Sequence, residues 1–272
     1  MNNDNKIDLR PSGIAGFFDC SYRWYRDTFD PIRHISVAAH LGTGLHKASE
    51  MFYRESIDKA SWQNFSSSYE DIAIGEFRSK LKEDEPSDIK EVDLNSIEST
   101  IVASTREYLK NARSLNNDVL PLAVEKTYEV SLKSQSIRAL KGTLDIVGHN
   151  YIADIKTMKK FKNPKDYLIQ QSLYALLRSR QGECVKDLMI HRVNVTKNEI
   201  DCVSILDAMS NKFVTIDTLV DRMIEYLKVI IKTCDEYYKT GDDYAFRGNP
   251  SSLLCSDKYC AYYSQCKYRK EM

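Results

Sequence analysis

The segment "GTLDIVGHNYIADIKT", residues 142–157, decides the fold predicted for this chain. Two short apolar runs flank a turn at His149 and Asn150, which is the pattern of an antiparallel hairpin. Either a two-residue turn there or a four-residue turn over 148–151 places Asp145 opposite Asp154. Because side chains alternate along a strand, the two aspartates share one face with Lys156, which we expect to be a charged cleft floor. The opposite, core face is expected to carry Leu144, Ile146, Ala153 and Ile155.

Two carboxylates opposed in this way need a cation. Their β-carbons would lie about 5 Å apart, and like charges at that position destabilise a sheet. Mg²⁺ or Mn²⁺ suits clustered oxygen ligands, polarises phosphoryl oxygens and lowers the pKa of bound water. Lys156 would orient or deprotonate an attacking water, or neutralise negative charge that develops during the reaction. The alternative is a solvated face with a local Asp–Lys ion pair.

Composition predicts a soluble globular protein. The chain has 272 residues, of which 42% are hydrophobic, which is enough for a substantial core. The polar N-terminus and the lack of a long apolar run predict no signal peptide, no membrane contact and a cytoplasmic location. Lysine plus arginine and aspartate plus glutamate each number 39, so net charge gives no reason to expect nucleic acid, although local patches can still bind it.

Periodicity predicts a mixed α/β fold in a single domain over residues 1–272. A helix begins at Pro11, and helical spacing continues at 35–59, 62–81 and 92–115. The later elements are strands at 122–132, 137–147 and 151–157, a helix at 164–181, strands at 187–195 and 199–206, and a helix at 209–240. The expected organisation is a mainly helical region over 1–120, an α/β core over 121–206, and a helix plus cysteine-rich segment over 207–272.

The seven cysteines are unevenly spaced. An odd number in a reducing compartment argues against a disulfide framework. Cys255, Cys260 and Cys266 fall within twelve residues, which favours a metal site, either zinc or iron–sulfur. The isolated cysteines, Cys184, Cys202 and Cys234, are interpreted as ordinary buried or half-buried side chains.

"GTLDIV" followed by "ADIKT" resembles the PD-(D/E)XK nuclease superfamily, specifically its RecB-like branch. Further matching features are "GTGLHKASE", "AVEKTYEV" and the Q-x-x-x-Y pattern of "QQSLYALL". The resemblance implies a restriction-endonuclease-like core, with a mixed central sheet flanked by helices, an N-terminal helical region and a C-terminal cysteine-rich segment. It also implies phosphodiester hydrolysis by a two-metal mechanism. The implied metal ligands are His46, Asp145, Asp154 and Ile155, and the implied catalytic residues include Glu125 and Gln170. Tyr174, one helical turn after Gln170, would contact DNA or serve only in packing.

"FFDCSYRWY" and "NPSSLLCSDKYCAYYSQCKY" resemble the cysteine segments of the iron–sulfur members of this branch. The resemblance implies a [4Fe-4S] cluster that joins the two ends of the chain, with zinc as the rival metal. The C-x4-C-x5-C spacing differs from the C-x2-C found in many relatives. The implied ligands are Cys20, Cys255, Cys260 and Cys266.

The expected partner is DNA, as single strands or ends, with a possible recombination or helicase protein. The lysine-rich run "KTMKKFKNPK" contributes Lys159 and Lys160 as phosphate contacts. Arg23 is a further candidate, beside Trp24 and Tyr25, whose rings could stack on bases. The predicted function is a metal-dependent DNA exonuclease in recombination, repair or phage DNA processing. The alternatives are a non-catalytic DNA-binding or complex-assembly protein, and a CRISPR-adaptation nuclease subunit that needs a partner.

Overall fold

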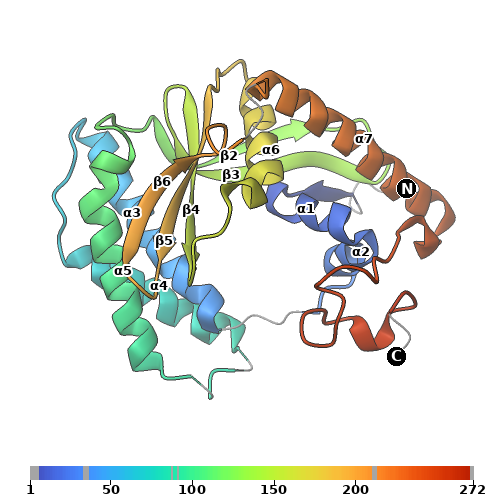
Figure 1. Ribbon diagram of the computed structural model, residues 1–272, viewed down its shortest axis with the longest axis horizontal. Coiled ribbons are helices and arrows are strands. Elements are labelled where there is room, and N and C mark those ends of the chain that lie inside the picture. Colours follow the sequence, from blue (N-terminus) through green and yellow to red (C-terminus); the bar gives the residue numbers. More distant parts are fainter. Residues whose placement is uncertain (1–5, 33–36, 87, 91, 210–212, 270–272) are drawn as a thin grey trace.

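A six-stranded mixed sheet lies at the centre of the protein, with helices on both of its faces (Figure 1). The computed structural model describes residues 6–32, 37–86, 88–90, 92–209 and 213–269. The strands are β1 (Ile7–Leu9), β2 (Ala123–Ser131), β3 (Ile137–Val147), β4 (Tyr151–Met158), β5 (Asp187–Asn194) and β6 (Glu199–Ser204). The helices are α1 (Pro11–Asp19), α2 (Ser21–Phe29), α3 (Val37–Asp58), α4 (Ser68–Asp84), α5 (Leu94–Leu115), α6 (Leu168–Ser179) and α7 (Ile216–Thr240). This arrangement confirms the predicted mixed α/β fold with a flanked central sheet.

Strand β3 organises the sheet because three other strands pair with it. β2 pairs with it in antiparallel orientation, and β1 pairs in parallel with its first residues. β4 pairs with its last residues, where Ile146 lies opposite Ala153 and Val147 opposite Ile152, the register predicted for the hairpin. β4 then runs parallel to β5 over its whole length, as far as Met158. β3 and β4 therefore separate after two residue pairs and form a fork in the sheet.

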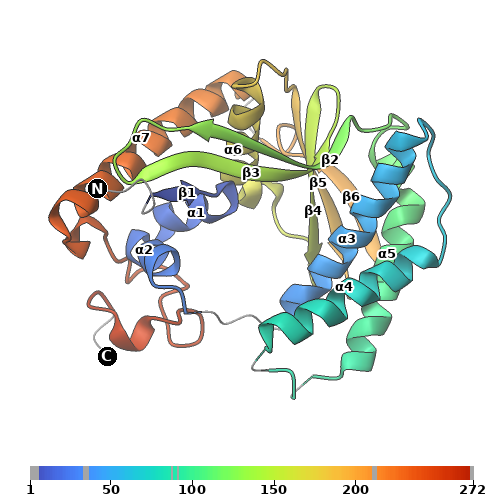
Figure 2. The same cartoon turned by 180° about the vertical axis from the view of Figure 1, so that it is seen from behind.

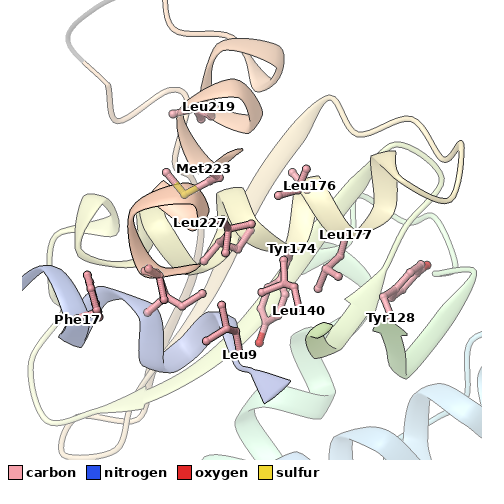
Figure 3. Close-up of a cluster of buried hydrophobic side chains, with 14 of the residues drawn as sticks. Leu9, Phe17, Tyr128, Leu140, Tyr174, Leu176, Leu177, Leu219, Met223 and Leu227 are labelled. Carbon is pink, nitrogen blue, oxygen red and sulfur yellow. The ribbon is translucent and has the colours of Figure 1, made fainter. Parts of the chain in front are cut away.

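Two hydrophobic clusters cover the two faces of the sheet. The first packs α1, α6 and α7 against β3, and Figure 3 shows its side chains, including Leu140, Tyr174 and Leu227. The second packs α3, α4 and α5 against the opposite face, on the other side of the sheet in Figure 2. Both faces are therefore buried by helices, and burying each large aliphatic side chain stabilises the fold by about 1.5–3 kcal/mol.

The predicted division of side chains between the faces is wrong at one position. Leu144 belongs to the first cluster, whereas Ile146 belongs to the second. Two residues that alternation assigns to one face therefore contact different helical layers. The change occurs around Asp145, where the pairing of β3 with β2 is interrupted at Glu125.

Two glycines allow helix α3 to pack closely on its neighbours. A β-carbon on Gly42 would lie 2.9 Å from Thr157 Oγ1 of β4, and one on Gly44 would lie 2.6 Å from the Ala73 carbonyl oxygen of α4. Contacts this short require the side chain of any larger residue to displace its neighbour. The glycines that interrupt the helical pattern before His46 therefore set the distance of α3 from β4 and from α4.

Several element boundaries differ from those predicted. β1 was not predicted, because three residues carry too little periodicity to detect. Helix α4 begins at Ser68 rather than at residue 62. Trp62 lies in the loop before α4 and packs on Phe52 of α3. Helix α7 begins at Ile216 rather than at 209, because Thr215 caps it. The helix predicted at 164–181 begins with a 3₁₀ turn over Pro164–Tyr167 and continues as α6 to Ser179.

No helix among the described residues is both long enough and apolar enough to cross a bilayer.

Candidate functional site

The site forms at the fork between β3 and β4. The predicted opposition of Asp145 and Asp154 lies one position beyond the last paired residues, so the two aspartates are not a ladder pair. Instead, the backbone N–H of Ile155 donates to Asp145 Oδ2 at 2.7 Å. A side-chain carboxylate thus accepts a bond at the position where β4 leaves β3. This bond holds Asp145 at the fork, with its side chain only 13% exposed.

Helix α3 brings His46 to the same point. Its Nε2 atom donates to the carbonyl oxygen of Ile155 at 3.0 Å. Its Nδ1 atom then faces Asp145 Oδ2 at 3.5 Å and Glu125 Oε1 at 3.9 Å. A bond from one ring nitrogen to a backbone carbonyl orients the imidazole and leaves the other nitrogen for a metal. In this arrangement Ile155 orients His46, and its predicted role as a metal ligand stays a prediction.

Glu125 occupies an unusual backbone conformation within β2. Its φ angle is 47°, in the left-handed region that a residue with a side chain rarely adopts in a strand. Such a conformation costs about 1–3 kcal/mol and persists where surrounding structure enforces it, often at functional sites. Here it accompanies the interruption in β2–β3 pairing opposite Asp145.

His46, Glu125 and Asp145 together form a group that could hold a cation. One ligand atom from each lies within 4.8 Å of the others. The three side chains come from α3, β2 and β3, and they remain partly open to solvent, with His46 at 30% and Glu125 at 27% exposed. Two carboxylates and an imidazole suit Mn²⁺, and the oxygen ligands also suit Mg²⁺.

The electrostatics of this group favour a bound positive charge. Burial favours the neutral imidazole, but the negative charges of Asp145 and Glu125 more than offset it and raise the pKa of His46 to about 9. Burial also raises the pKa of Asp145, with a further increase from Glu125, although His46 opposes both effects. Burial and the neighbouring carboxylate thus both disfavour the ionised form of Asp145. A divalent cation would favour the ionised carboxylates and offset both effects.

Asp154 lies beside this group but has its own partners. It is 2% exposed, its Oδ2 atom is 2.8 Å from Lys156 Nζ, and its Oδ1 atom accepts a bond from Gln170 Nε2 at 3.0 Å. Burial, followed by the charge of Asp145, raises the pKa of Asp154 to about 6, although Lys156 opposes the increase. Gln170 Nε2 also donates to Tyr174 Oη at 3.1 Å, as expected for residues one helical turn apart.

Lys156 is protonated in this environment. Burial favours its neutral form, but the charge of Asp154 and a hydrogen bond to it raise the lysine pKa above its usual value. Between the two roles considered for Lys156, a charged group that orients water or neutralises negative charge therefore fits better than a base.

One residue of the site was not predicted from the sequence. The ring of Tyr167 lies under Lys156, with Nζ 5.6 Å from the ring centroid. Tyr167 precedes Gln170 by three residues and Tyr174 by seven, which is the spacing of one helical face. Extending the Q-x-x-x-Y pattern backwards by one turn would have identified it.

The predicted DNA contacts are placed in different regions. Lys159 and Lys160 are exposed in the segment directly after β4, and neither forms an ion pair with a described residue. Arg23 lies on α2, away from the carboxylates, within 3.5 Å of Asp19. Trp24 is buried and Tyr25 half-buried, and both rings pack on Phe246, so their stacking on bases stays a prediction.

The four predicted cluster cysteines converge from the two ends of the chain. Cys20, Cys255, Cys260 and Cys266 all line one enclosed pocket between α2 and the C-terminal segment. All four are free thiols. Hydrogen bonds join the two segments, from Asn249 Nδ2 to the Asp19 carbonyl oxygen at 2.8 Å and from Ser252 Oγ to Asp19 Oδ2 at 3.0 Å.

Four thiolates in one pocket are a donor set that either a zinc ion or an iron–sulfur cluster could use.

Comparisons with known proteins identify one family. The chain matches the model of the PD-(D/E)XK nuclease superfamily over residues 9–267. A search of curated proteins gives no match. Among solved structures, the chain is similar to one titled "Crystal structure of SSO0001", with 15% sequence identity and a TM-score of 0.36, covering 95% of this chain and 98% of that chain.

Proposed function

The chain belongs to the PD-(D/E)XK nuclease superfamily, and we propose that it is a metal-dependent DNA exonuclease. It would act at DNA ends or in single strands during recombination, repair or phage DNA processing. The observation that supports this proposal is the convergence of His46, Glu125 and Asp145 beside the Asp154–Lys156 pair. These residues come from separate elements and meet at the fork in the sheet.

The side chains have distinct roles in the proposed reaction. His46, Glu125 and Asp145 would hold Mg²⁺ or Mn²⁺, with Asp154 completing the ligand set. The bound metal supplies a Lewis acid for the phosphate and lowers the pKa of water. Lys156, held protonated by Asp154, would orient the attacking water or neutralise negative charge on the phosphate. Gln170 would fix the Asp154 carboxylate through its amide and keep it turned toward the site.

DNA is the proposed partner at this site. Lys159 and Lys160 follow the catalytic strand directly and have no ion-pair partner in the described chain, so their charges are available to phosphates. Tyr174 is 7% exposed and bonded to Gln170, so its proposed contribution is chiefly to position that residue.

We further propose that Cys20, Cys255, Cys260 and Cys266 hold a structural [4Fe-4S] cluster. The supporting observation is their common pocket between the first helices and the C-terminal segment. A cluster there would clamp α2 to a segment with little regular structure, because four covalent ligands replace packing that the segment lacks.

Incubation of end-labelled linear DNA and circular DNA with Mg²⁺ or Mn²⁺ tests the nuclease proposal. We expect linear DNA to be shortened and circular duplex DNA to remain intact. Asp145→Asn should abolish the activity, and Lys156→Ala should reduce it by about 10²–10⁴-fold. Lys197→Ala, in an exposed pair with Glu199 on the β5–β6 turn, is the control and should be fully active. Full activity of Asp145→Asn would refute the site.

The cluster proposal is tested by the iron, sulfide and zinc content of protein purified without oxygen. We expect a brown protein with four irons per chain. Cys255→Ser should lose the iron, whereas Cys184→Ser, exposed and outside the pocket, should retain it. Zinc bound in place of iron would contradict this assignment.

A further inference from the structure

A groove runs along β3 and α1. It has a volume of about 1150 Å³, and its walls include Arg10 and Ser12 at the start of α1 and Lys141 and Thr143 of β3. Tyr174 also lines the groove, and its Oη atom accepts a bond from Gln170 Nε2, which in turn donates to Asp154 Oδ1. One end of the groove is therefore connected to Asp154 through the Tyr174 and Gln170 side chains.

A second hollow continues this groove across the C-terminal segment. Arg23 and Asp27 of α2 line both hollows. The second has a volume of about 620 Å³, and its far wall includes Lys258 and Tyr259. Because the two share walls, they form one path from the groove beside Tyr174 to the cysteine-bearing segment. That segment and α2 lie side by side in both Figure 1 and Figure 2.

The far end of this path has the chemistry of a single-strand binding surface. The Tyr259 side chain is 57% exposed, although large aromatic rings are normally buried. Lys258 Nζ lies 5.2 Å from the centroid of that ring, so a cation accompanies the exposed aromatic face. Exposed aromatic rings beside cations bind unpaired nucleic acid, because any base can stack on the ring while the cation contacts phosphate.

Each end of the path carries a cation that could contact phosphate. Arg10 and Lys258 form no ion pair with any described residue, so one available cation stands near each end. Of the acids that line the path, Asp8 is paired with Arg138, whereas Asp27 and Asp257 form no ion pair with a described residue. A duplex keeps its bases stacked on one another, so only an unpaired strand can use the Tyr259 ring.

We propose that this groove binds an unpaired nucleic-acid strand that extends from the carboxylate site, with Tyr259 as a base-stacking platform and Arg10 and Lys258 as phosphate contacts. The inference rests on the proposed function, because it takes the strand at the carboxylates to be the substrate. It assigns to the cysteine-bearing segment a direct contact with substrate, in addition to any structural role.

The dependence of binding on strand length tests this inference. Labelled oligothymidylates of about 4 to 16 nucleotides, the range of single-strand site sizes, are titrated with holo-protein by fluorescence anisotropy. Calcium replaces magnesium so that binding is measured without cleavage. Tyr259→Ala should weaken binding of the longest strand by about tenfold and leave the shortest unchanged. Tyr259→Phe should bind like the wild type, because it retains the ring.

Tyr244→Ala is the matched control. Tyr244 is 60% exposed in the same part of the chain, but it lies outside the groove, with Lys267 Nζ 3.4 Å from its ring centroid. This variant should bind every strand like the wild type. Iron content is measured for each variant, so that loss of the cysteine site is separated from loss of stacking.

Failure of the inference and failure of the proposed function give different results. If Tyr259→Ala binds every length like the wild type while wild-type protein degrades DNA, the groove assignment is overturned and the nuclease proposal stands. If length-dependent binding requires Tyr259 but no divalent ion supports cleavage, the groove assignment stands and the nuclease proposal falls.

Discussion

Replacing Asp154 with asparagine should stabilise the metal-free protein while abolishing its activity. The pKa of this buried carboxyl is raised from 3.8 to about 6, mainly by burial and then by the charge of Asp145. At 1.36 kcal/mol per pKa unit, ionised Asp154 destabilises the folded state by about 3 kcal/mol at pH 7. Asparagine keeps the oxygen that accepts from Gln170 and removes the charge. The gain has about 3 kcal/mol as its upper limit, because Lys156 loses its anionic partner.

The contribution of Asp154 to stability changes with pH in a defined direction. Between pH 3.8 and about 6 the folded wild type binds more protons at Asp154 than the unfolded chain does, so its stability falls as the pH rises through this window. The stability advantage of Asp154→Asn should therefore be fully present above pH 6 and absent below pH 4. With metal present, the wild type should be more stable than Asp154→Asn, because a cation that binds only the folded wild type stabilises it by mass action.

Thermal and denaturant unfolding in EDTA and in excess Mn²⁺ measure both effects. In EDTA at pH 7, Asp154→Asn should melt several degrees above wild type, at about 2–4 °C per kcal/mol. Asp235→Asn is the control of opposite sign. Burial opposes ionisation there as well, but bonds from Ser134 and Ser136 lower the pKa of Asp235, so this variant should lose stability. A metal-free Asp154→Asn that melts below wild type would refute the reasoning.

Three further predictions follow from backbone packing and buried charge. Gly44→Ala should destabilise the fold by about 1–3 kcal/mol because its β-carbon meets the Ala73 carbonyl, whereas Gly75→Ala, with open space around it in α4, should stabilise the fold by about 0.5–1 kcal/mol. Denaturant unfolding that shifts in the same direction for both variants would contradict this. Glu125→Gly and Glu125→Ala should both lose activity, but the glycine variant should be the more stable by about 1 kcal/mol because φ is 47° at this position. Equal melting temperatures of the two variants would show that the backbone at residue 125 is not strained. Burial lowers the pKa of His191 to about 4, so the folded state binds fewer protons than the unfolded one and its stability should fall by about 3 kcal/mol as the pH drops from 6.5 to 4. His191→Leu should remove this part of the acid sensitivity, and a variant with the pH profile of the wild type would contradict the role of His191.

The sequence by itself determined the elements whose information is local. Alternation around His149 and Asn150 specified the hairpin and its register, because a turn sets the pairing of the strands that flank it. Helical spacing placed Gln170 and Tyr174 on one face, and the structure joins them by a hydrogen bond. The four cysteines could be grouped only through family resemblance, since no local pattern links Cys20 to the C-terminal segment.

Only the tertiary structure decided how these elements meet at the site. The register of the hairpin did not reveal that β4 leaves β3 at Asp145 to pair with β5, because that choice depends on a strand whose residues lie 36 positions further along the chain. Periodicity likewise could not show that Trp24 would be buried, or that Tyr108 would donate to or accept from His191 Nδ1 at 2.9 Å. Local patterns record which residues prefer burial or a given backbone shape, whereas the position of His46 against Ile155 results from packing between segments 109 residues apart.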